Sequence, residues 1–194
     1  MRMLPMPCGE PPETRTAPLT EENLGEAPEW EAHPWSSKYC LYSEHPELWA
    51  NPKAGNRAEA FQRKLAWVRR VRAEFGECGR LLYPDGQAVG YAQCGPPSFF
   101  PNARSYPAGP VSDGAVFLAC LFFPWGAHRG RGWGSLLQDI LRELRSPGLS
   151  AVETFARKES AENPSGPVAF SIRHGFEVRR DDPEFPLLRL NLSR

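Results

Sequence analysis

The sequence predicts an α/β (α+β) domain in which helices flank one central sheet. Helical and strand patterns alternate along the chain: an amphipathic helix over 56–75, a hairpin over 80–94, and an apolar strand followed by a second amphipathic helix between 115 and 144. Hydrophobic residues make up 41% of the chain, which is enough to build a core. We therefore expect a folded domain.

The first 30 residues differ in composition from the rest of the chain. They contain six prolines and few large apolar side chains before Trp30. Such a stretch cannot bury enough apolar surface to form a core of its own. We expect residues 1–30 to be an extended N-terminal arm and residues 31–194 to form a single domain.

The stretch from Asn56 to Phe75 predicts the first long helix. Asn56 and Glu59 have the spacing of a capping box, with Asn in place of Ser or Thr, and Gly76 suits the C-terminal cap. The apolar side chains at helical spacing are Phe61, Leu65, Val68, Val71 and Phe75. The cationic side chains are Arg57, Arg63, Lys64, Arg69, Arg70 and Arg72. We expect this cationic face to be solvated.

The strands and the remaining helix follow from turn residues and apolar runs. Strands over 80–83 and 88–94 flank the turn residues Pro84-Asp85-Gly86, which predicts a β-hairpin. Residues 115–123 are apolar throughout, as expected for a strand that is buried on both faces. The other predicted elements are a short strand or turn over 38–42, a strand over 151–156, a short helix over 167–174 closed by Gly175, and a terminal strand over 185–192.

Charge and composition argue against several classes of protein. Lys+Arg and Asp+Glu both number 23, and this zero net charge argues against a dedicated nucleic-acid binder. The longest apolar run has nine residues, too few to cross a membrane as a helix, and nothing resembles a signal peptide. Five cysteines without regular spacing indicate neither a disulfide framework nor a structural zinc site. We expect a cytoplasmic protein without a bound metal.

A glycine-rich turn before the second long helix carries the strongest chemical signal. Residues 126–134 contain four glycines together with Arg129 and Arg131. The first turn of a helix has free N–H groups, and glycine lets the backbone close around phosphate oxygens. The alternative is a connection that is glycine-rich only because it turns tightly. Neither the Gly-Lys-Ser/Thr of a P-loop nor the Gly-x-Gly-x-x-Gly dinucleotide fingerprint is present.

This turn resembles the coenzyme A motif of the GNAT superfamily of acyl-CoA-dependent N-acyltransferases. That motif, Gln/Arg-x-x-Gly-x-Gly/Ala, lies between a central strand and a long helix, and here it reads Arg129-Gly130-Arg131-Gly132-Trp133-Gly134. Gly175-Phe176 and the hairpin over 80–94 are also typical of the family, so the resemblance covers about residues 36–194. It implies a mixed, mostly antiparallel sheet with splayed middle strands.

The resemblance also implies how acyl-CoA is bound. Backbone N–H groups of residues 129–135 hold the diphosphate, while the end of the apolar strand pairs with the pantetheine arm and polarises the thioester. The implied CoA-binding residues are Leu121, Phe122, Phe123, Arg129, Gly130, Arg131, Gly132, Trp133, Gly134, Ser135 and Asn163.

The catalytic groups depart from the family pattern. Many members have a Tyr four residues before the Gly-Phe glycine, where it protonates the departing thiolate; here that residue is Ser171. The attacking amine must be neutral, so a base must remove its proton. Glu153, on the strand beside the splay, is the candidate base. The alternative is that Glu153 faces the surface as an ordinary strand residue and takes no part in catalysis.

We therefore expect an N-acetyltransferase that uses acetyl-CoA and a primary amine of a small molecule or a peptide. The loop over 95–114 then either covers the acceptor pocket or is a proline-stiffened surface loop. The alternative, favoured by Ser171, is a non-catalytic acyl-CoA-binding sensor or partner-binding module. No nucleic-acid or membrane partner is expected, and the chain is expected to be a monomer or a homodimer.

Overall fold

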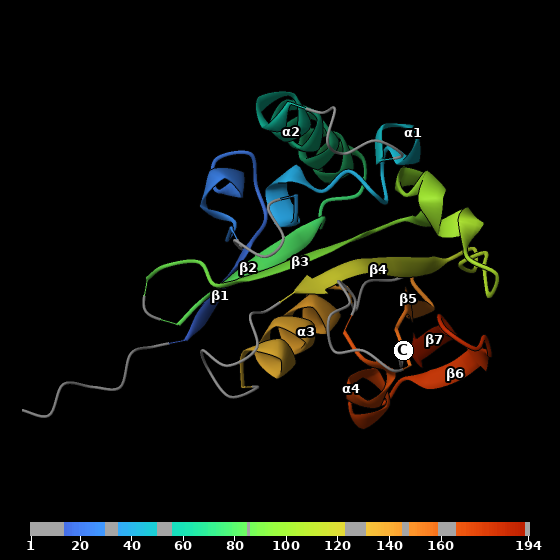
Figure 1. Ribbon diagram of the computed structural model, residues 1–194. Coiled ribbons are helices and arrows are strands. Elements are labelled where there is room, and N and C mark those ends of the chain that lie inside the picture. Colours follow the sequence, from blue (N-terminus) through green and yellow to red (C-terminus); the bar gives the residue numbers. More distant parts are fainter. Residues whose placement is uncertain are drawn as a thin grey trace, which may run out of the picture.

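A seven-stranded sheet forms the centre of the protein (Figure 1). The computed structural model describes residues 14–29, 35–49, 56–84, 86–122, 131–144, 148–158 and 166–192. The strands are β1 (Arg15–Pro18), β2 (Gly79–Tyr83), β3 (Gly90–Gly95), β4 (Ala115–Phe122), β5 (Ala151–Phe155), β6 (Glu177–Arg180) and β7 (Leu187–Asn191). The α-helices are α1 (Pro46–Trp49), α2 (Arg57–Glu74), α3 (Arg131–Glu143) and α4 (Val168–Arg173). The strand order is β1-β2-β3-β4-β5-β7-β6, and β4–β5 is the parallel pair in an otherwise antiparallel sheet.

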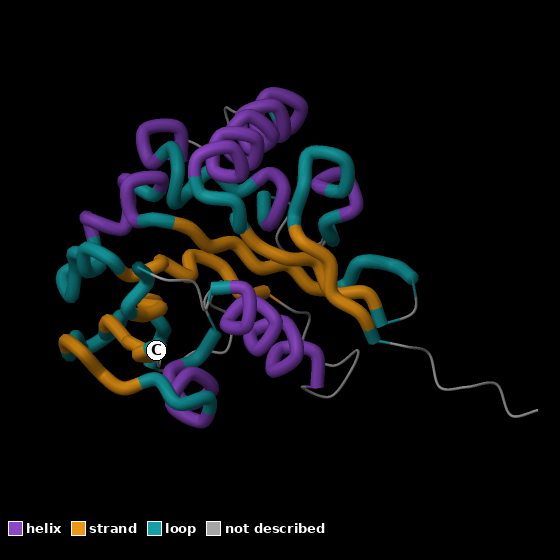
Figure 2. The backbone as a smooth tube through the Cα atoms, turned by 180° about the vertical axis from the view of Figure 1, so that it is seen from behind, coloured by secondary structure: helices purple, strands orange, loops and turns teal. Residues whose placement is uncertain are grey.

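Helices cover both faces of this sheet. Helix α2 lies on one face and helices α3 and α4 lie on the other, as both views of the backbone show (Figures 1 and 2). We call these faces the α2 face and the α3 face. The core on the α2 face includes Trp67, Val68, Val71, Tyr91 and Phe117. The core on the α3 face includes Val116, Leu118, Leu136, Leu137 and Ile140. Successive residues of β4 thus serve the two cores alternately, which explains its continuous apolar sequence.

The predicted first helix is confirmed, with one correction. The Asn56 side chain accepts a hydrogen bond from the Ala58 amide at 2.8 Å, and Gly76 ends the helix with φ +100°. Lys64, however, is not solvated, because its side chain is 0% exposed. It lies four residues from both Ala60 and Val68, and therefore on the buried side of α2.

The N-terminal segment differs from the predicted arm. Strand β1 pairs with β2 at the edge of the sheet, and the Thr16 hydroxyl donates to Asp139 on α3 at 2.6 Å. Leu19 and Leu24 are at most 1% exposed and belong to the core on the α2 face. The boundary at residue 30 is therefore wrong: the described residues from Arg15 onward are part of the domain. A few apolar side chains suffice here because the rest of that core comes from α2 and the sheet.

Other differences concern short elements. The predicted hairpin, the strands β4, β5 and β7, and the helices α3 and α4 are present. Residues 37–39 form a 3-10 helix where a short strand or turn was expected, and β6 had not been predicted. The segment over 95–114 contains two 3-10 helices, Pro97–Phe99 and Pro101–Ser105. Among the described residues, no helix is long and apolar enough to cross a membrane.

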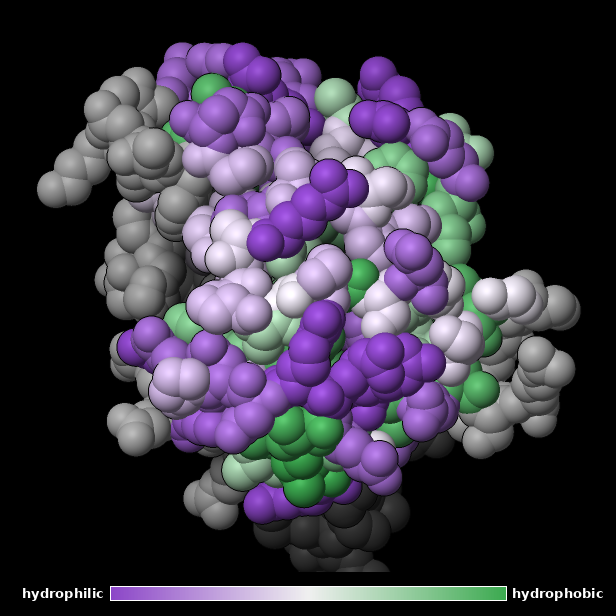
Figure 3. All heavy atoms as spheres, turned by 90° about the vertical axis from the view of Figure 1, so that its right-hand side faces the viewer, coloured by the Kyte–Doolittle hydropathy of each residue, from purple (hydrophilic) through white to green (hydrophobic). Residues whose placement is uncertain are grey.

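The surface is hydrophilic where the right-hand side of Figure 1 faces the viewer (Figure 3). A small apolar patch near the bottom of this view is bordered by hydrophilic side chains. Within the described part of the chain, the exposed large apolar residues are Leu48, Ile172 and Val178. Isolated apolar residues of this kind are ordinary on a protein surface.

Candidate functional site

The middle strands β4 and β5 diverge toward their C-terminal ends. Their parallel ladder joins residues 115–117 to residues 151–153, and the Thr154 hydroxyl adds a hydrogen bond to the Leu118 carbonyl at 2.8 Å. Beyond these contacts, β4 continues to Phe122 as an antiparallel partner of β3, whereas β5 continues to Phe155 as a partner of β7. We call this divergence the splay, and it confirms the expected opening of the sheet.

A β-bulge in β4 marks the place where the splay begins. The register against β3 shifts between Gln93 and Cys94, because their partners on β4 are Cys120 and Leu118. Ala119 and its neighbour Cys120 both pack against the α2-face core, while Leu121 returns to the α3 face. A bulge bends and twists its strand. Here it turns the end of β4 away from the parallel ladder.

The first turns of α3 lie next to the end of β4. Leu121 of β4 and Leu136 of α3 are at most 1% exposed and belong to the same buried cluster. The apolar side of α3, a helix that the sequence predicts to be amphipathic, is thus the surface that fixes the helix on the sheet. This packing brings the first turn of α3, with its amide groups and partial positive charge, beside the splay.

A polar cluster lies on the α2 face of the sheet at the level of the bulge. Lys64 donates to Glu44 and to the side-chain oxygen of Gln93, and Gln93 also donates to Glu44. The Tyr91 hydroxyl donates to the same Gln93 oxygen at 3.0 Å. We call these four residues the Lys64 cluster. Gln93 is directly opposite Cys120 in the sheet, so the cluster lies beside the splay.

Sequence reasoning missed the Lys64 cluster. The spacing of Lys64 within the buried side of α2 was an available signal, since Ala60, Val68 and Val71 are all buried. Its partner Glu44 is 20 residues earlier in the chain, and its partner Gln93 is 29 residues later. No local pattern links these positions.

Solved structures share the overall fold of this chain. No protein-family model and no curated protein matches the sequence. The PaiA N-acetyltransferase from Thermoplasma acidophilum, in complex with coenzyme A, matches with a TM-score of 0.54 and 12% identity over 92% of this chain and 99% of that chain. An N-acetyltransferase from Staphylococcus aureus Mu50 matches with a TM-score of 0.56 and 12% identity over 93% and 99%. The protein yncA of Salmonella typhimurium, solved with its cofactor acetyl-CoA, matches with a TM-score of 0.56 and 18% identity over 94% and 95%.

The chain has the GNAT fold. At such low identities the likeness concerns the fold, and the chemistry must be argued from this chain's own residues.

The GNAT fold brings together some of the predicted CoA-binding residues. Leu121 and Phe122 are at the end of β4, and residues 131–135 form the first turns of α3. The predicted CoA-binding residues Phe123, Arg129, Gly130 and Asn163 lie outside the described residues. For Arg131, Gly132 and Trp133 the structure describes the helical backbone.

Glu153 is neither a surface residue nor an accessible base. Its side chain is 0% exposed, at the last step of the β4–β5 ladder. The Ser112 amide and hydroxyl donate to its two oxygens at 2.7 and 2.8 Å, and Arg189 donates at 2.8 Å. Arg179 lies 3.3 Å from the same carboxylate. A carboxylate engaged in this way ties the loop before β4 to β7 and has no open approach for an amine.

Ser171 lies on the side of α4 that is buried, and is 3% exposed. Its carbonyl accepts hydrogen bonds from the amides of His174 and Phe176, which close the end of the helix before Gly175. Gly175 adopts φ +90°, a conformation that favours glycine. Nothing in these contacts assigns a proton-transfer role to its hydroxyl, and that role stays a prediction.

The 95–114 segment contributes Tyr106 to a group of aromatic side chains on the α2 face. We call Tyr106 and its neighbour Tyr42 the Tyr106 wall. The Tyr106 ring stacks on Phe155, the last residue of β5, with ring centroids 4.2 Å apart. Tyr42 meets Tyr106 edge-on, and the Asn102 amide donates to the Ser43 carbonyl. Phe155 lies beyond the last β4–β5 pair, so this wall packs on the part of β5 that is no longer paired with β4. We call this part the free end of β5.

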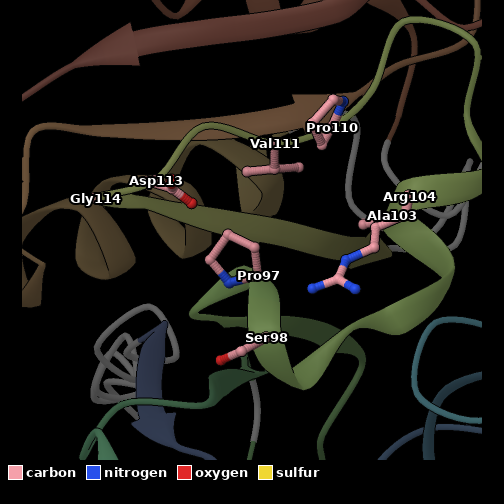
Figure 4. A pocket seen from close by; sticks show the side chains of 8 residues that line it. All are labelled: Pro97, Ser98, Ala103, Arg104, Pro110, Val111, Asp113 and Gly114. Atoms are coloured by element: carbon pink, nitrogen blue, oxygen red, sulfur yellow. The ribbon is translucent and has the colours of Figure 1, made fainter.

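A pocket of about 370 Å³ is present at the other end of β4 (Figure 4). Arg104 and Asp113 point into it from opposite sides, and Pro97 and Ser98 form its floor in this view. Gly114, which also lines it, immediately precedes β4. The pocket therefore lies at the N-terminal end of β4, whereas the candidate site is located by the splay toward the C-terminal end of that strand.

The thiols near the splay are not activated. Burial raises the pKa of both Cys40 and Cys120, so neither is a thiolate at neutral pH. Cys40, Cys78, Cys94 and Cys120 are all free. Among the described residues, no group of three or more His, Cys, Asp or Glu side chains is arranged to hold a metal ion.

Proposed function

We propose that the protein is an acyl-CoA-dependent N-acyltransferase, most simply an acetyltransferase, that modifies a primary amine. The observation that carries this proposal is the splay beside the first turn of α3 in a GNAT fold. Solved structures of this fold include one in complex with coenzyme A and one with acetyl-CoA.

The residues beside the splay fit an acyl-CoA thioester. The first N–H groups of α3 have no partner within the helix and attract a diphosphate. The backbone of Leu121 and Phe122 then supplies strand-like hydrogen bonds to the two amides of the pantetheine arm. An N–H at the end of β4 stabilises the negative charge that develops on the thioester oxygen during attack.

Direct attack by the amine fits the surroundings better than a covalent acyl-enzyme. The nearest thiol on the strand, Cys120, is kept protonated by burial and is a poor nucleophile. In direct transfer the amine nitrogen bonds to the acyl carbon, the C–S bond breaks and the sulfur leaves as a thiolate, and the proton that the nitrogen gives up balances the proton that the thiolate takes up. A thiol ionises near pH 8.5, so it leaves readily even with Ser171 where many GNAT proteins have Tyr.

The amine acceptor is proposed to enter on the α2 face. Helices α3 and α4 occupy the opposite face, where acyl-CoA is proposed to bind. The wall formed by Tyr42 and Tyr106 lies on the α2 face over the free end of β5. A small molecule or the amine of a peptide is the proposed acceptor.

The proposal is tested by measuring thiol release from acetyl-CoA with a panel of primary amines. CoA binding is measured in parallel by titration calorimetry. We expect CoA to bind and at least one amine to accelerate thiol release above the rate of hydrolysis, with an acetylated amine as product. Absence of CoA binding would overturn both the activity and the proposed site.

The second candidate function is a non-catalytic acyl-CoA-binding module. Ser171 favours it, because a serine hydroxyl at this buried position replaces the phenol that many GNAT proteins use as an acid. In the same experiment, saturable CoA binding without turnover of any amine would select this function.

A further inference from the structure

The pocket at the N-terminal end of β4 lies between the two ends of the 95–114 segment. Residues between 97 and 104 supply one wall, and residues between 110 and 114 supply the other (Figure 4). Its volume of about 370 Å³ is at the lower end of the range for sites that bind small molecules. The pocket therefore suits a compound of modest size.

The first wall is anchored on both sides of Arg104. Ala103 is 3% exposed and belongs to the core on the α2 face. The Asn102 amide donates to the Ser43 carbonyl at 3.2 Å, and the Ser105 hydroxyl donates to the Asn102 carbonyl at 2.8 Å. The backbone that carries Arg104 is therefore held in place before any ligand arrives.

The second wall is anchored on both sides of Asp113. The Ser112 amide and hydroxyl donate to the buried Glu153 carboxylate. The Gly114 carbonyl accepts hydrogen bonds from the Ser150 amide and hydroxyl at 3.0 and 3.1 Å. Because Asp113 lies between these two anchored residues, its backbone is fixed as well.

Arg104 and Asp113 extend into the pocket from these opposite walls (Figure 4). Within the described part of the chain, neither side chain has a hydrogen bond or an ion pair. Solvated charges are ordinary on a protein surface. Here, however, two opposite charges converge on one hollow with anchored walls, as polar groups do in sites for small molecules.

The two charges together select the kind of ligand. An anion that is attracted by Arg104 is repelled by Asp113, and a cation that is attracted by Asp113 is repelled by Arg104. A molecule with both an ammonium and a carboxylate group pairs with the two side chains at once. The apolar side chains of Pro97, Pro110 and Val111 line the pocket and can contact the carbon atoms between those groups.

We propose that this pocket is a binding site for an amino acid, a compound with an ammonium and a carboxylate group. Arg104 receives the carboxylate, and Asp113 receives the ammonium group. The bound compound thereby links the two ends of the segment that carries Tyr106. The site lies at the opposite end of β4 from the proposed acyl-CoA site, and it does not depend on the proposed acyl transfer.

The test measures the binding of amino acids to the full chain without acyl-CoA. The standard L-amino acids, β-alanine and γ-aminobutyrate are screened at about 10 mM by thermal shift, and the best of them is titrated by calorimetry. We expect at least one compound to raise the melting temperature and to bind saturably. Acetate and methylamine, which each carry a single charge, should do neither at the same concentration.

Matched variants assign each side chain to one group of the ligand. Arg104→Gln and Asp113→Asn should each weaken binding of the titrated amino acid roughly 10-fold or more. Amidation of the ligand's carboxylate should weaken binding to the native protein, but should change binding to Arg104→Gln by less than about twofold. Acetylation of the ligand's amine should give the same pattern with Asp113→Asn. The controls Arg142→Gln and Asp181→Asn, which remove exposed charges on α3 and after β6, should leave the affinity unchanged.

Any of three results would overturn the amino-acid site. No compound of the panel binds saturably; acetate or methylamine binds as tightly as the best amino acid; or the affinity is unchanged in Arg104→Gln or in Asp113→Asn. Both side chains are exposed, so the variants should fold, and their melting temperatures check this. Because no step of the test uses acyl transfer, a failure of the proposed activity leaves its outcome unaffected.

Discussion

The ion pair between Lys64 and Glu44 is buried, which makes it costly to form. Their side chains are 0% and 2% exposed. Removing two charges from water costs several kcal/mol per ion, and the attraction between them often does no more than offset that cost. Gln93 and Tyr91 complete the hydrogen bonds. The pair therefore fixes the position of Glu44 against β3 more than it adds net stability.

Breaking this pair from one side should destabilise the protein strongly. Lys64→Met leaves the Glu44 carboxylate buried without its cation, and we expect the free energy of unfolding to fall by about 3–5 kcal/mol. The double variant Lys64→Met with Glu44→Leu should recover most of this loss. Urea unfolding measures both. Arg63→Ala, which breaks the exposed Arg63–Glu59 pair one residue away on α2, serves as the control and should cost about 0.5 kcal/mol. Equal losses in Lys64→Met and Arg63→Ala would contradict the assignment.

Residues whose role depends on a distant partner escaped prediction. Leu136 and Ile140 lie at helical spacing in the second predicted amphipathic helix, and both are 0% exposed. Glu153 looked like a possible base because it lies beside the splay, but its partners Ser112 and Arg189 come from other segments. A sequence shows the chemical type of such a side chain and its element. It does not show which groups from distant segments form hydrogen bonds or ion pairs with that side chain.

At the scale of elements, local pattern strength decided what could be predicted. Helix α2 has a cap at each end, and β4 is a continuous apolar run, so both were found. All four residues of the edge strand β6 are exposed, so no apolar alternation marks it. The splay itself was implied by family resemblance, because a register that stops after three pairs has no local signature.

The Tyr106 wall should influence the acceptor more than acyl-CoA. Tyr106→Ala removes the ring that stacks on Phe155 at the free end of β5, on the face opposite α3 and α4. We expect the KM of the amine to change roughly tenfold, and the KM of acetyl-CoA to change less than twofold. Tyr39→Ala, which alters a partly buried ring packed on Phe61, is the matched control and should leave both KM values unchanged. Equal changes in the two KM values for Tyr106→Ala would show that the Tyr106 wall is not part of the acceptor site.

At the scale of the whole molecule, the sheet separates the proposed acyl-CoA site from the proposed acceptor site. Its α3 face carries the helices that are proposed to hold acyl-CoA, and its α2 face carries the Lys64 cluster and the Tyr106 wall. The splay is the place where the two faces meet. Such a division requires a rigid sheet, and the sheet is continuous from β1 to β6. The N-terminal segment extends this sheet by one strand, and it therefore helps to hold the proposed binding sites in place.

This support predicts different outcomes for two N-terminal deletions. Deleting residues 1–30 removes β1 and the buried side chains of Leu19, Leu24 and Ala27. Burying a leucine stabilises a protein by about 1.5–3 kcal/mol, so the two leucines together contribute about 3–6 kcal/mol. A typical domain is stable by only about 5–15 kcal/mol. We expect the shorter chain to unfold at a much lower urea concentration or to fail to fold.

Deleting only residues 1–13 keeps β1 and both leucines, and the unfolding midpoint should then fall much less than in the longer deletion. Circular dichroism during urea unfolding measures all three proteins. The same midpoint for both deletions would show that the segment from Arg15 onward is the dispensable arm that its composition suggests. A loss confined to the longer deletion would show instead that a proline-rich segment with two leucines completes the core, because its partners on β2 and α2 supply the remaining apolar surface.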